Sequence, residues 1–272
     1  MEMLARGRSS LSRSLNWLVF LAVGLVFLGW LLSTPSGLLG KADAIGYAVC
    51  HRIDLRSFHL GARQLPLCAR CTGMYLGAVI GLVYQFSFFP KRSGAPPRGI
   101  LVSMAVLFLA FAFDGINSYL SLFPGVPTLY PPNNTLRLLT GSGMGVVIAA
   151  VLFIAFNQTV WKDWEAAPAL GDWRTFGGLL GLGLFFDGLI LIENPLVLYP
   201  LALISALGVM VLLTMIYAML LLIITRAENR FSRIGELYLP LTAGFALGLL
   251  QVGTLDLLRF WLTGTWDGFH LG

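Results

Sequence analysis

Long apolar stretches recur along the whole chain, and they restrict its fold more than any other feature. Hydrophobic residues make up 57% of the 272 residues and charged residues only 11%, whereas soluble domains carry roughly 25% charged residues. A helix needs roughly 17–25 mostly apolar residues to cross a bilayer. The sequence therefore predicts an all-α integral membrane protein with about seven transmembrane helices in a single polytopic domain, 1–272. The predicted spans are 15–32, 72–89, 99–122, 138–156, 175–192, 196–225 and 237–262.

Positively charged residues predict the orientation, because the cytoplasmic loops of membrane proteins carry an excess of Lys and Arg. With the N-terminus inside, the inner segments hold eleven positive residues and the outer segments seven, of which five lie in the loop 33–71. We therefore expect a cell-membrane protein with a cytoplasmic N-terminus and this loop outside. The inner residues are Arg6, Arg8, Arg13, Lys91, Arg92, Arg98, Lys162, Arg174, Arg226, Arg230 and Arg233, and the outer residues are Lys41, Arg52, Arg56, Arg63, Arg70, Arg137 and Arg259.

Glycines four residues apart mark several of the predicted spans. Such ridges of small residues let helix backbones approach closely in lipid, so they predict a tightly packed bundle. The ridges are Gly73/Gly77/Gly81, Gly141/Gly145, Gly177/Gly181 and Gly244/Gly248.

All three cysteines lie within 22 positions of the loop 33–71. Cys50 is followed by His51, and Cys68 and Cys71 form a Cys-x-x-Cys pair just before a predicted span. Thiolate and imidazole are preferred ligands of zinc, and four of them make a closed structural site. The sequence therefore predicts a zinc site of Cys50, His51, Cys68 and Cys71, with His59 as a reserve ligand. If only three of these groups bind the ion, an open position remains for water and catalysis.

Two other interpretations of the cysteines stay open. Thiols just before a helix N-terminus have stabilised thiolates, and the outer face of a membrane is oxidising. Cys68 and Cys71 would then be a redox pair coupled to quinone, with Cys50 as a third, exchanging thiol. Alternatively, the three residues are buried small side chains, with or without a structural disulfide.

Four arginines surround the cysteines: Arg52, Arg56, Arg63 and Arg70. Guanidinium groups suit phosphate and carboxylate, so this set predicts an anion-binding site for a small anion, a phospholipid or a polyprenyl phosphate. Simple contact with lipid headgroups is the alternative. The net charge of +5 requires no nucleic-acid partner, because most basic residues lie in short loops.

Polar residues inside the predicted spans indicate pairing or function, because charges in a membrane are costly. Asp114 and Asn117 lie one helical turn apart, and the short connection after them returns the chain with Asn134 and Arg137. We expect these four to meet in the interior, with Asp114 or His59 as the base if the protein is an enzyme. Asp256 and Arg259 are three residues apart and are expected to neutralise each other. Phe-Phe-Asp187-Gly echoes Ala-Phe-Asp114-Gly and raises the possibility of a repeat.

The segment from Cys50-His51 to Gln64-Leu-Pro-Leu-Cys68-Ala-Arg-Cys71-Thr-Gly resembles an uncharacterised family of predicted bacterial and archaeal multi-pass membrane proteins, a domain of unknown function. The resemblance is specific over 50–89 and extends to Asp114-Gly and to Asn134-x-x-Arg137. It supports the site residues without implying a reaction. Three classes of function remain: a binding or structural protein in contact with lipid or other membrane subunits, a metal-dependent enzyme acting on an anionic or lipid-linked substrate, and a thiol oxidoreductase.

Overall fold

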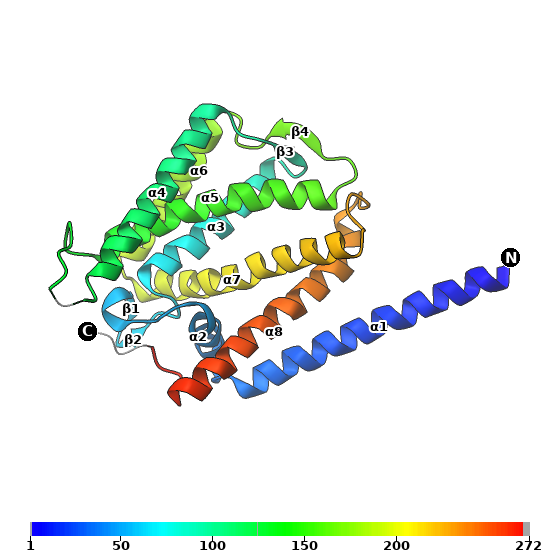
Figure 1. Ribbon diagram of the computed structural model, residues 1–272, viewed down its shortest axis with the longest axis horizontal. Coiled ribbons are helices and arrows are strands. Elements are labelled where there is room, and N and C mark those ends of the chain that lie inside the picture. The colour runs from blue at the N-terminus through cyan, green and yellow to red at the C-terminus, as the bar shows by residue number, and fades with distance from the viewer. Residues whose placement is uncertain (1, 124, 269–272) are drawn as a thin grey trace.

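The computed structural model describes residues 2–123 and 125–268, with side chains from Trp17 onward, and this part of the chain is largely helical (Figure 1). The all-α class predicted from the apolar stretches is confirmed. Two short 3₁₀ helices, Asp54–Arg56 and Ile234–Leu237, accompany the α-helices. The α-helices are α1 (Glu2–Ser33), α2 (Gly37–Val49), α3 (Ala69–Phe88), α4 (Arg98–Leu120), α5 (Asn134–Val160), α6 (Trp173–Leu191), α7 (Pro195–Ile224) and α8 (Tyr238–Thr263).

Six helices in the described part are long and apolar enough to cross a membrane, namely α3 to α8. The first predicted span behaves differently. The described apolar part of α1, Trp17–Ser33, is followed by α2 at an angle of 102°, so the two make a seventh span only if the bent pair counts as one. Lys41 of α2 fixes this bend, because its Nζ donates to the carbonyl oxygens of Leu31 and Thr34 at the end of α1. The side chains of Arg6, Arg8 and Arg13 lie outside the described part.

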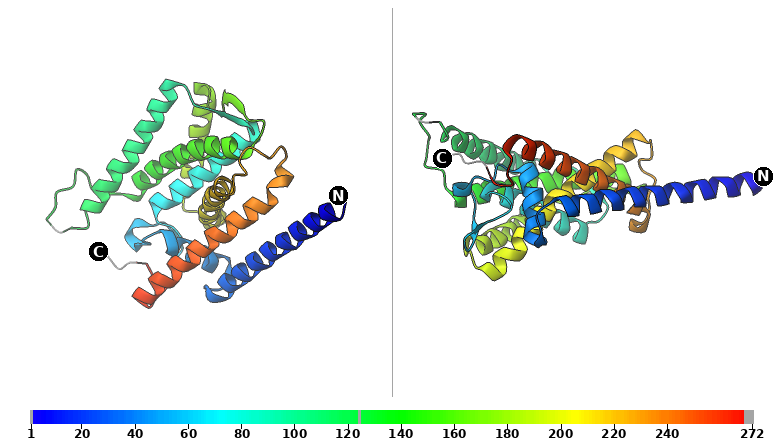
Figure 2. Two further views of the ribbon diagram at one scale, coloured as in Figure 1. Left: turned by 45° about the vertical axis from the view of Figure 1, so that its right-hand side comes forward. Right: turned by 90° about the horizontal axis from the view of Figure 1, so that it is seen from below.

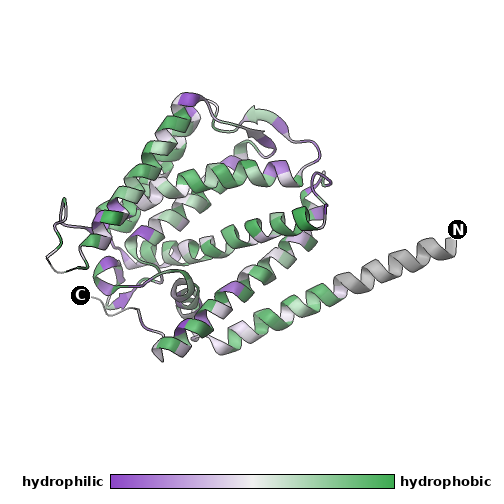
Figure 3. Cartoon of the chain, in the orientation of Figure 1, coloured by the Kyte–Doolittle hydropathy of each residue, from purple (hydrophilic) through white to green (hydrophobic). Residues whose placement is uncertain are grey.

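The connections gather at two opposite ends of the bundle (Figures 1 and 2). We define the Cys end as α2 together with segments 50–68, 121–123, 125–133, 192–194 and 264–268. It contains the hairpin of β1 (His59–Leu60) and β2 (Arg63–Gln64). The opposite end holds β3 (Arg92–Gly94) and β4 (Glu165–Pro168), which pair in parallel. Figure 3 shows hydrophobic residues along the helices and hydrophilic residues mainly toward these two ends, as a bilayer-spanning bundle requires.

Two of the predicted glycine ridges face each other across the contact of α3 with α5. A Cβ on Gly73 would lie 2.3 Å from the Leu138 carbonyl oxygen, and one on Gly141 would lie 2.2 Å from that of Arg70. Only glycine permits this approach. Gly244 of α8 similarly touches the backbone of α7, where its Cβ would lie 2.5 Å from the Thr214 oxygen. The prediction fails at Gly177 and Gly181, because a Cβ there has no described atom within 4 Å.

Helix α4 is apolar on its outer face and polar on its inner face. Phe113 and Ile116 are 54% and 62% exposed, whereas Asp114, Asn117 and Ser118 are buried. In a membrane this arrangement places the phenylalanine and isoleucine against lipid and the polar residues in the protein interior. The inner face of α4 thereby becomes part of the site at the Cys end.

Candidate functional site at the Cys end

Two helix ends position the three cysteines. Cys50 is the C-terminal cap of α2, and its backbone N–H donates to the Gly46 carbonyl at 2.8 Å. Cys68 is the N-terminal cap of α3, and Cys71 lies in the first turn of that helix. Gly46 lets α2 touch the segment before α3, since a Cβ there would lie 1.9 Å from the Pro66 oxygen. The end of one helix therefore meets the start of the next.

The structure brings the three sulfur atoms together. The Sγ atoms of Cys50, Cys68 and Cys71 all lie within 4.8 Å of one another. Cys50 and Cys68 are buried, and the backbone N–H of Cys68 donates to the Cys50 sulfur at 3.3 Å. The Cys68 and Cys71 thiols also donate to this sulfur and hold the pKa of Cys50 well below its ordinary value. The cluster therefore stabilises a thiolate.

Neither histidine joins this cluster. Among the described His, Cys, Asp and Glu residues, only the three cysteines form a group with metal-ligand spacing. The Nδ1 atom of His51 accepts a hydrogen bond from the Ile53 N–H at 3.1 Å, and burial lowers the pKa of His51. His59, the reserve ligand, has its Nε2 2.8 Å from the exposed carboxylate of Asp54. The expected fourth ligand is therefore not in place.

The four predicted anion-binding arginines separate into two pairs. Arg52 and Arg63 both contact Asp43 of α2, at 3.0 and 2.5 Å. Arg70 instead forms a salt bridge with Asp114, with its Nε 3.1 Å from the carboxylate. Arg56 donates to the Ser118 carbonyl at 2.9 Å. Of these four arginines, Arg56 and Arg70 thus reach the inner face of α4, and Arg52 and Arg63 do not.

The buried carboxylate of Asp114 has a different partner from the one expected. Its oxygens accept from Arg70, from the Tyr130 hydroxyl at 2.8 Å and from the Thr140 hydroxyl at 3.3 Å. Asn117 lies on the same face, but it bonds to the backbone of Leu129 and of Tyr130. Among the described residues no direct bond joins Asp114 to Asn134 or Arg137, because Arg70 supplies the charge from α3. Arg137 still interacts with Asp114 electrostatically.

Arg137 of α5 is 5% exposed and binds the hydroxyl of Ser118 through Nε and Nη2, at 3.2 and 2.9 Å. Its Nη1 donates to Asn134 at 2.8 Å. Arg137, Arg56 and Arg70 all act electrostatically on His51. We call Arg56, Arg70 and Arg137 the arginine triad. Burial and the charge of Arg70 lower the pKa of Arg56.

Asp256 and Arg259 of α8 interact electrostatically, and each also forms hydrogen bonds with other residues. Arg259 donates to the carbonyl oxygens of Tyr47 and Cys50 at 2.6 and 2.7 Å and lies 4.0 Å above the Tyr47 ring. It thereby ties α8 to the end of α2. The indole N–H of Trp30 donates to Asp256 at 3.4 Å.

The two echoed aspartates are both buried and sit on either side of α5. Asp114 meets Thr140, and Asp187 of α6 interacts with Ser142. Asp187 Oδ2 has no hydrogen-bond partner among the described residues.

A polar pocket of about 550 Å³ opens beside the hairpin at the Cys end. His59, Asp54, Asn134 and Glu193 line it. The candidate base His59 therefore lies beside open space, in a pocket that it shares with Asn134, the partner of Arg137.

No sequence pattern indicated the polar contacts of Tyr130 and Thr140. Tyr130 lies among prolines in a connection, and Thr140 is a small polar residue in an apolar helix. Only the return of α5 beside α4 brings both to Asp114.

Comparison with known proteins finds a family of predicted membrane proteins and two uncharacterized archaeal relatives. The family described as "Predicted membrane protein (DUF2085)" matches residues 50–151, which include the cysteines, the arginine triad and Asp114. An uncharacterized protein of Methanothermobacter thermautotrophicus is 31% identical over 103 residues, covering 38% of this chain and 83% of the relative. One of Methanocaldococcus jannaschii is 24% identical over 124 residues, covering 45% and 72%. No solved structure matches the chain.

Proposed function

The chain belongs to this family of predicted membrane proteins (DUF2085), and we propose that it binds one thiophilic metal ion, zinc, through Cys50, Cys68 and Cys71. The main support for this proposal is that the three sulfur atoms lie within 4.8 Å of one another. Zinc–sulfur bonds of about 2.3 Å place the sulfurs of one site roughly 3.5–4 Å apart. The observed upper limit of 4.8 Å is compatible with that spacing.

The arrangement favours a metal over a disulfide. A disulfide joins two sulfurs and leaves the third unused, whereas one ion uses all three. The Cys68 N–H also donates to the Cys50 sulfur, which is the kind of contact that stabilises a metal-binding thiolate.

The proposed role of the ion is structural and binding. It would join the C-terminus of α2 to the N-terminus of α3, so that metal binding contributes to the folding free energy of the Cys end. Ligation of the ion through His51 Nδ1 would require this atom to give up its bond from the Ile53 N–H. Water is therefore the better fourth ligand in the geometry observed, and this is the open position that the enzyme candidate described below would use.

The test is metal analysis of the purified protein together with a count of free thiols. We expect one zinc ion per chain and no disulfide. Cys50→Ser should lose the ion, while His59→Ala, which removes an imidazole outside the cluster, should keep it. Absence of metal together with a Cys68–Cys71 disulfide would instead support the quinone-coupled oxidoreductase.

A second candidate function rests on the arginine triad. The charges of all three guanidinium groups act on His51. Asp114 forms its salt bridge with Arg70, so the charge balance favours an anionic ligand. Arg70 Nη1 has no hydrogen-bond partner among the described residues and is available to such a ligand. An enzyme acting on an anionic or lipid-linked substrate would use the ion as a Lewis acid. Its base would be His59, because Asp114 is already held by Arg70.

The triad is tested by phosphate binding. Arg56→Ala should weaken binding of inorganic phosphate, and vesicles containing phosphatidic acid show whether a lipid headgroup is preferred. Arg63→Ala is the matched control, since Arg63 contacts Asp43 instead. Equal binding by both variants would remove this candidate.

We further propose that the Cys end faces the outside of the cell membrane. The five positive residues of 33–71 were the exception to the charge rule. Arg52, Arg63 and Arg70 form salt bridges with aspartates, and Lys41 caps α1. These positive residues have structural partners within the protein. We therefore infer the orientation from the positive residues of the opposite end, which favour placing that end in the cytoplasm.

A further inference from the structure

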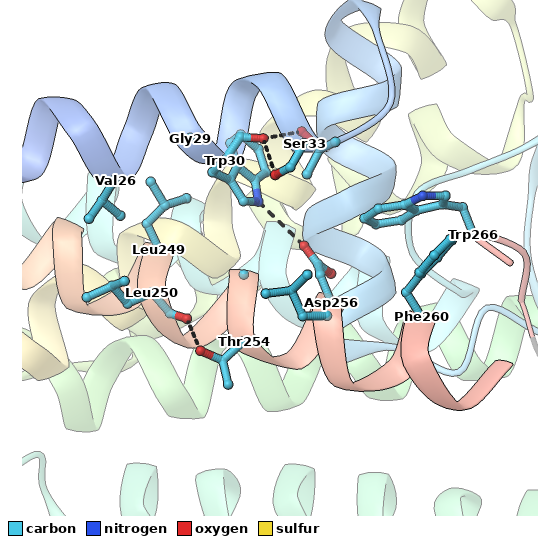
Figure 4. A pocket seen from close by; sticks show the side chains of 13 residues that line it. Val26, Gly29, Trp30, Ser33, Leu249, Leu250, Thr254, Asp256, Phe260 and Trp266 are labelled. Atoms are coloured by element: carbon cyan, nitrogen blue, oxygen red, sulfur yellow. Dashed lines mark hydrogen bonds between the residues drawn. The ribbon is translucent and has the colours of Figure 1, made fainter. Parts of the chain in front are cut away.

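A cavity of about 440 Å³ lies between α1 and α8, near the Cys end but outside the site described above. Its walls are mostly apolar. Figure 4 shows Phe260 and Trp266 at one end, Val26 and Leu250 at the other, and Trp30 between them. Among these residues Leu250 is 47% exposed and Phe260 is 40% exposed, so the cavity can be entered from the bilayer.

One polar side chain in this cavity has unused hydrogen-bonding capacity. Asp256 is 3% exposed and lines the cavity. Its Oδ2 accepts from the Trp30 indole, as Figure 4 shows, whereas Oδ1 has no partner among the described residues. A buried acceptor without a partner costs free energy. This oxygen therefore indicates a ligand that brings a donor.

Charges nearby favour a neutral donor over a cation. Arg259 lies one turn further along α8 and acts on Asp256 electrostatically. Lys41 Nζ lies 5.8 Å from the ring centre of Trp30, the residue that donates to Asp256. These two positive charges would repel an ammonium group at Asp256. A hydroxyl group meets no such repulsion.

The shape of the cavity selects a ring with an apolar tail. The Phe260 and Trp266 rings have centroids 5.6 Å apart and are inclined by 38°, and flat ligands stack favourably on such side chains. Toward the membrane interior, a Cβ added to Gly29 would have no described atom within 4 Å. The groove beside Gly29 therefore has room for a hydrocarbon chain.

We propose that this cavity binds an isoprenoid quinol, with a phenolic O–H donated to Asp256 Oδ1 and the chain lying between α1 and α8. The ring would occupy the aromatic end, and the tail would extend past Gly29 into the bilayer. This proposal is independent of the metal site, because none of its contacts involves a cysteine side chain.

The test is equilibrium binding of decylubiquinol to the purified, detergent-solubilised protein. We expect saturable binding of one molecule per chain. Gly29→Leu fills the groove and should weaken binding at least ~tenfold, and Asp256→Asn should weaken it ~tenfold through loss of a hydrogen bond to a charged acceptor. Gly24→Leu is the matched control, because a Cβ at Gly24 also has no described atom within 4 Å and Gly24 does not line the cavity. It should bind like the unaltered protein.

Three results would overturn the proposal: no saturable binding by the unaltered protein, unchanged binding by Gly29→Leu, or equal competition by dodecanol, which has a hydroxyl and a chain but no ring. Gly29→Leu keeps the test decisive even if Asp256→Asn folds poorly. Cys50→Ser, which removes the proposed metal, should leave quinol binding unchanged.

Discussion

Replacing Asp114 by Leu should destabilise the protein through the charge that it leaves on Arg70. The Asp114 side chain is 2% exposed and that of Arg70 is 18% exposed. Removing one member of a buried ion pair costs roughly 3–5 kcal/mol. Because Arg70 retains some access to solvent, we expect about 3 kcal/mol, near the lower limit. Asp114→Asn should cost about half as much, since an amide oxygen in the place of Oδ2 still accepts from Arg70 and Thr140.

The assay is equilibrium unfolding in mixed micelles with increasing sodium dodecyl sulfate. The double variant Arg70→Met/Asp114→Leu should lose less than the sum of the two single variants, by on the order of 1–2 kcal/mol. Arg63→Met is the matched control. Its side chain is 49% exposed, so it should cost at most about 1 kcal/mol. A loss below about 0.5 kcal/mol for Asp114→Leu, or additive losses in the double variant, would refute this reasoning.

Three further predictions concern packing, pH and orientation. Gly141→Val should destabilise the contact of α3 with α5 by about 1–3 kcal/mol or more, because its Cβ would lie 2.2 Å from the Arg70 carbonyl oxygen. The Gly177→Ala variant, by contrast, should unfold at the same or a higher detergent concentration than the unaltered protein. Backbone N–H groups of Thr175 and Arg174 lower the pKa of the capping residue Asp172. The ionised Asp172 should therefore stabilise the folded protein above the ordinary carboxyl pKa, and this stabilisation should disappear as the pH falls through the lowered value. The stability difference between the unaltered protein and Asp172→Ala, followed by unfolding against pH, should therefore shrink in acid, and a constant difference would contradict this. In a chain whose own cysteines are replaced, a cysteine introduced at Ser36 should react with an impermeant maleimide on intact cells and one at Ser93 only after lysis; the reverse pattern would place the Cys end in the cytoplasm.

Features of the fold that depend on long apolar stretches could be predicted from the sequence. The spans α3 to α8 follow from hydropathy, and the ridges on α3 and α5 follow from glycine spacing. The ridge of Gly177 and Gly181 has the same spacing, yet it faces no described neighbour. Spacing places small residues on one face of a helix, but it does not show which helix approaches that face.

Helix α2 was missed for a different reason. Its 13 residues include Gly37, Gly40 and Gly46, which lower intrinsic helix stability. Tertiary contacts compensate for this: Lys41 caps α1, and Gly46 touches Pro66. Such contacts join parts of the chain that the local sequence cannot relate.

The candidate site could be predicted only in part for the same reason. The convergence of Cys68 and Cys71 follows from a Cys-x-x-Cys at a helix start. The partners of the arginines do not, because Arg70 meets Asp114 across 44 positions and Arg52 meets Asp43 instead of an external anion. Residue type predicted the need for a partner, and the three-dimensional packing determined which partner is used.

X-ray absorption at the zinc edge tests the central proposal most directly. On protein purified without added metal, we expect three sulfur neighbours at about 2.3 Å and one nitrogen or oxygen neighbour at roughly 2.0–2.2 Å. Cys50→Ser should lose the zinc signal or reduce the number of sulfur neighbours. A first shell containing only nitrogen and oxygen, or protein without zinc and with three intact free thiols, would contradict the assignment of Cys50, Cys68 and Cys71 as a metal site.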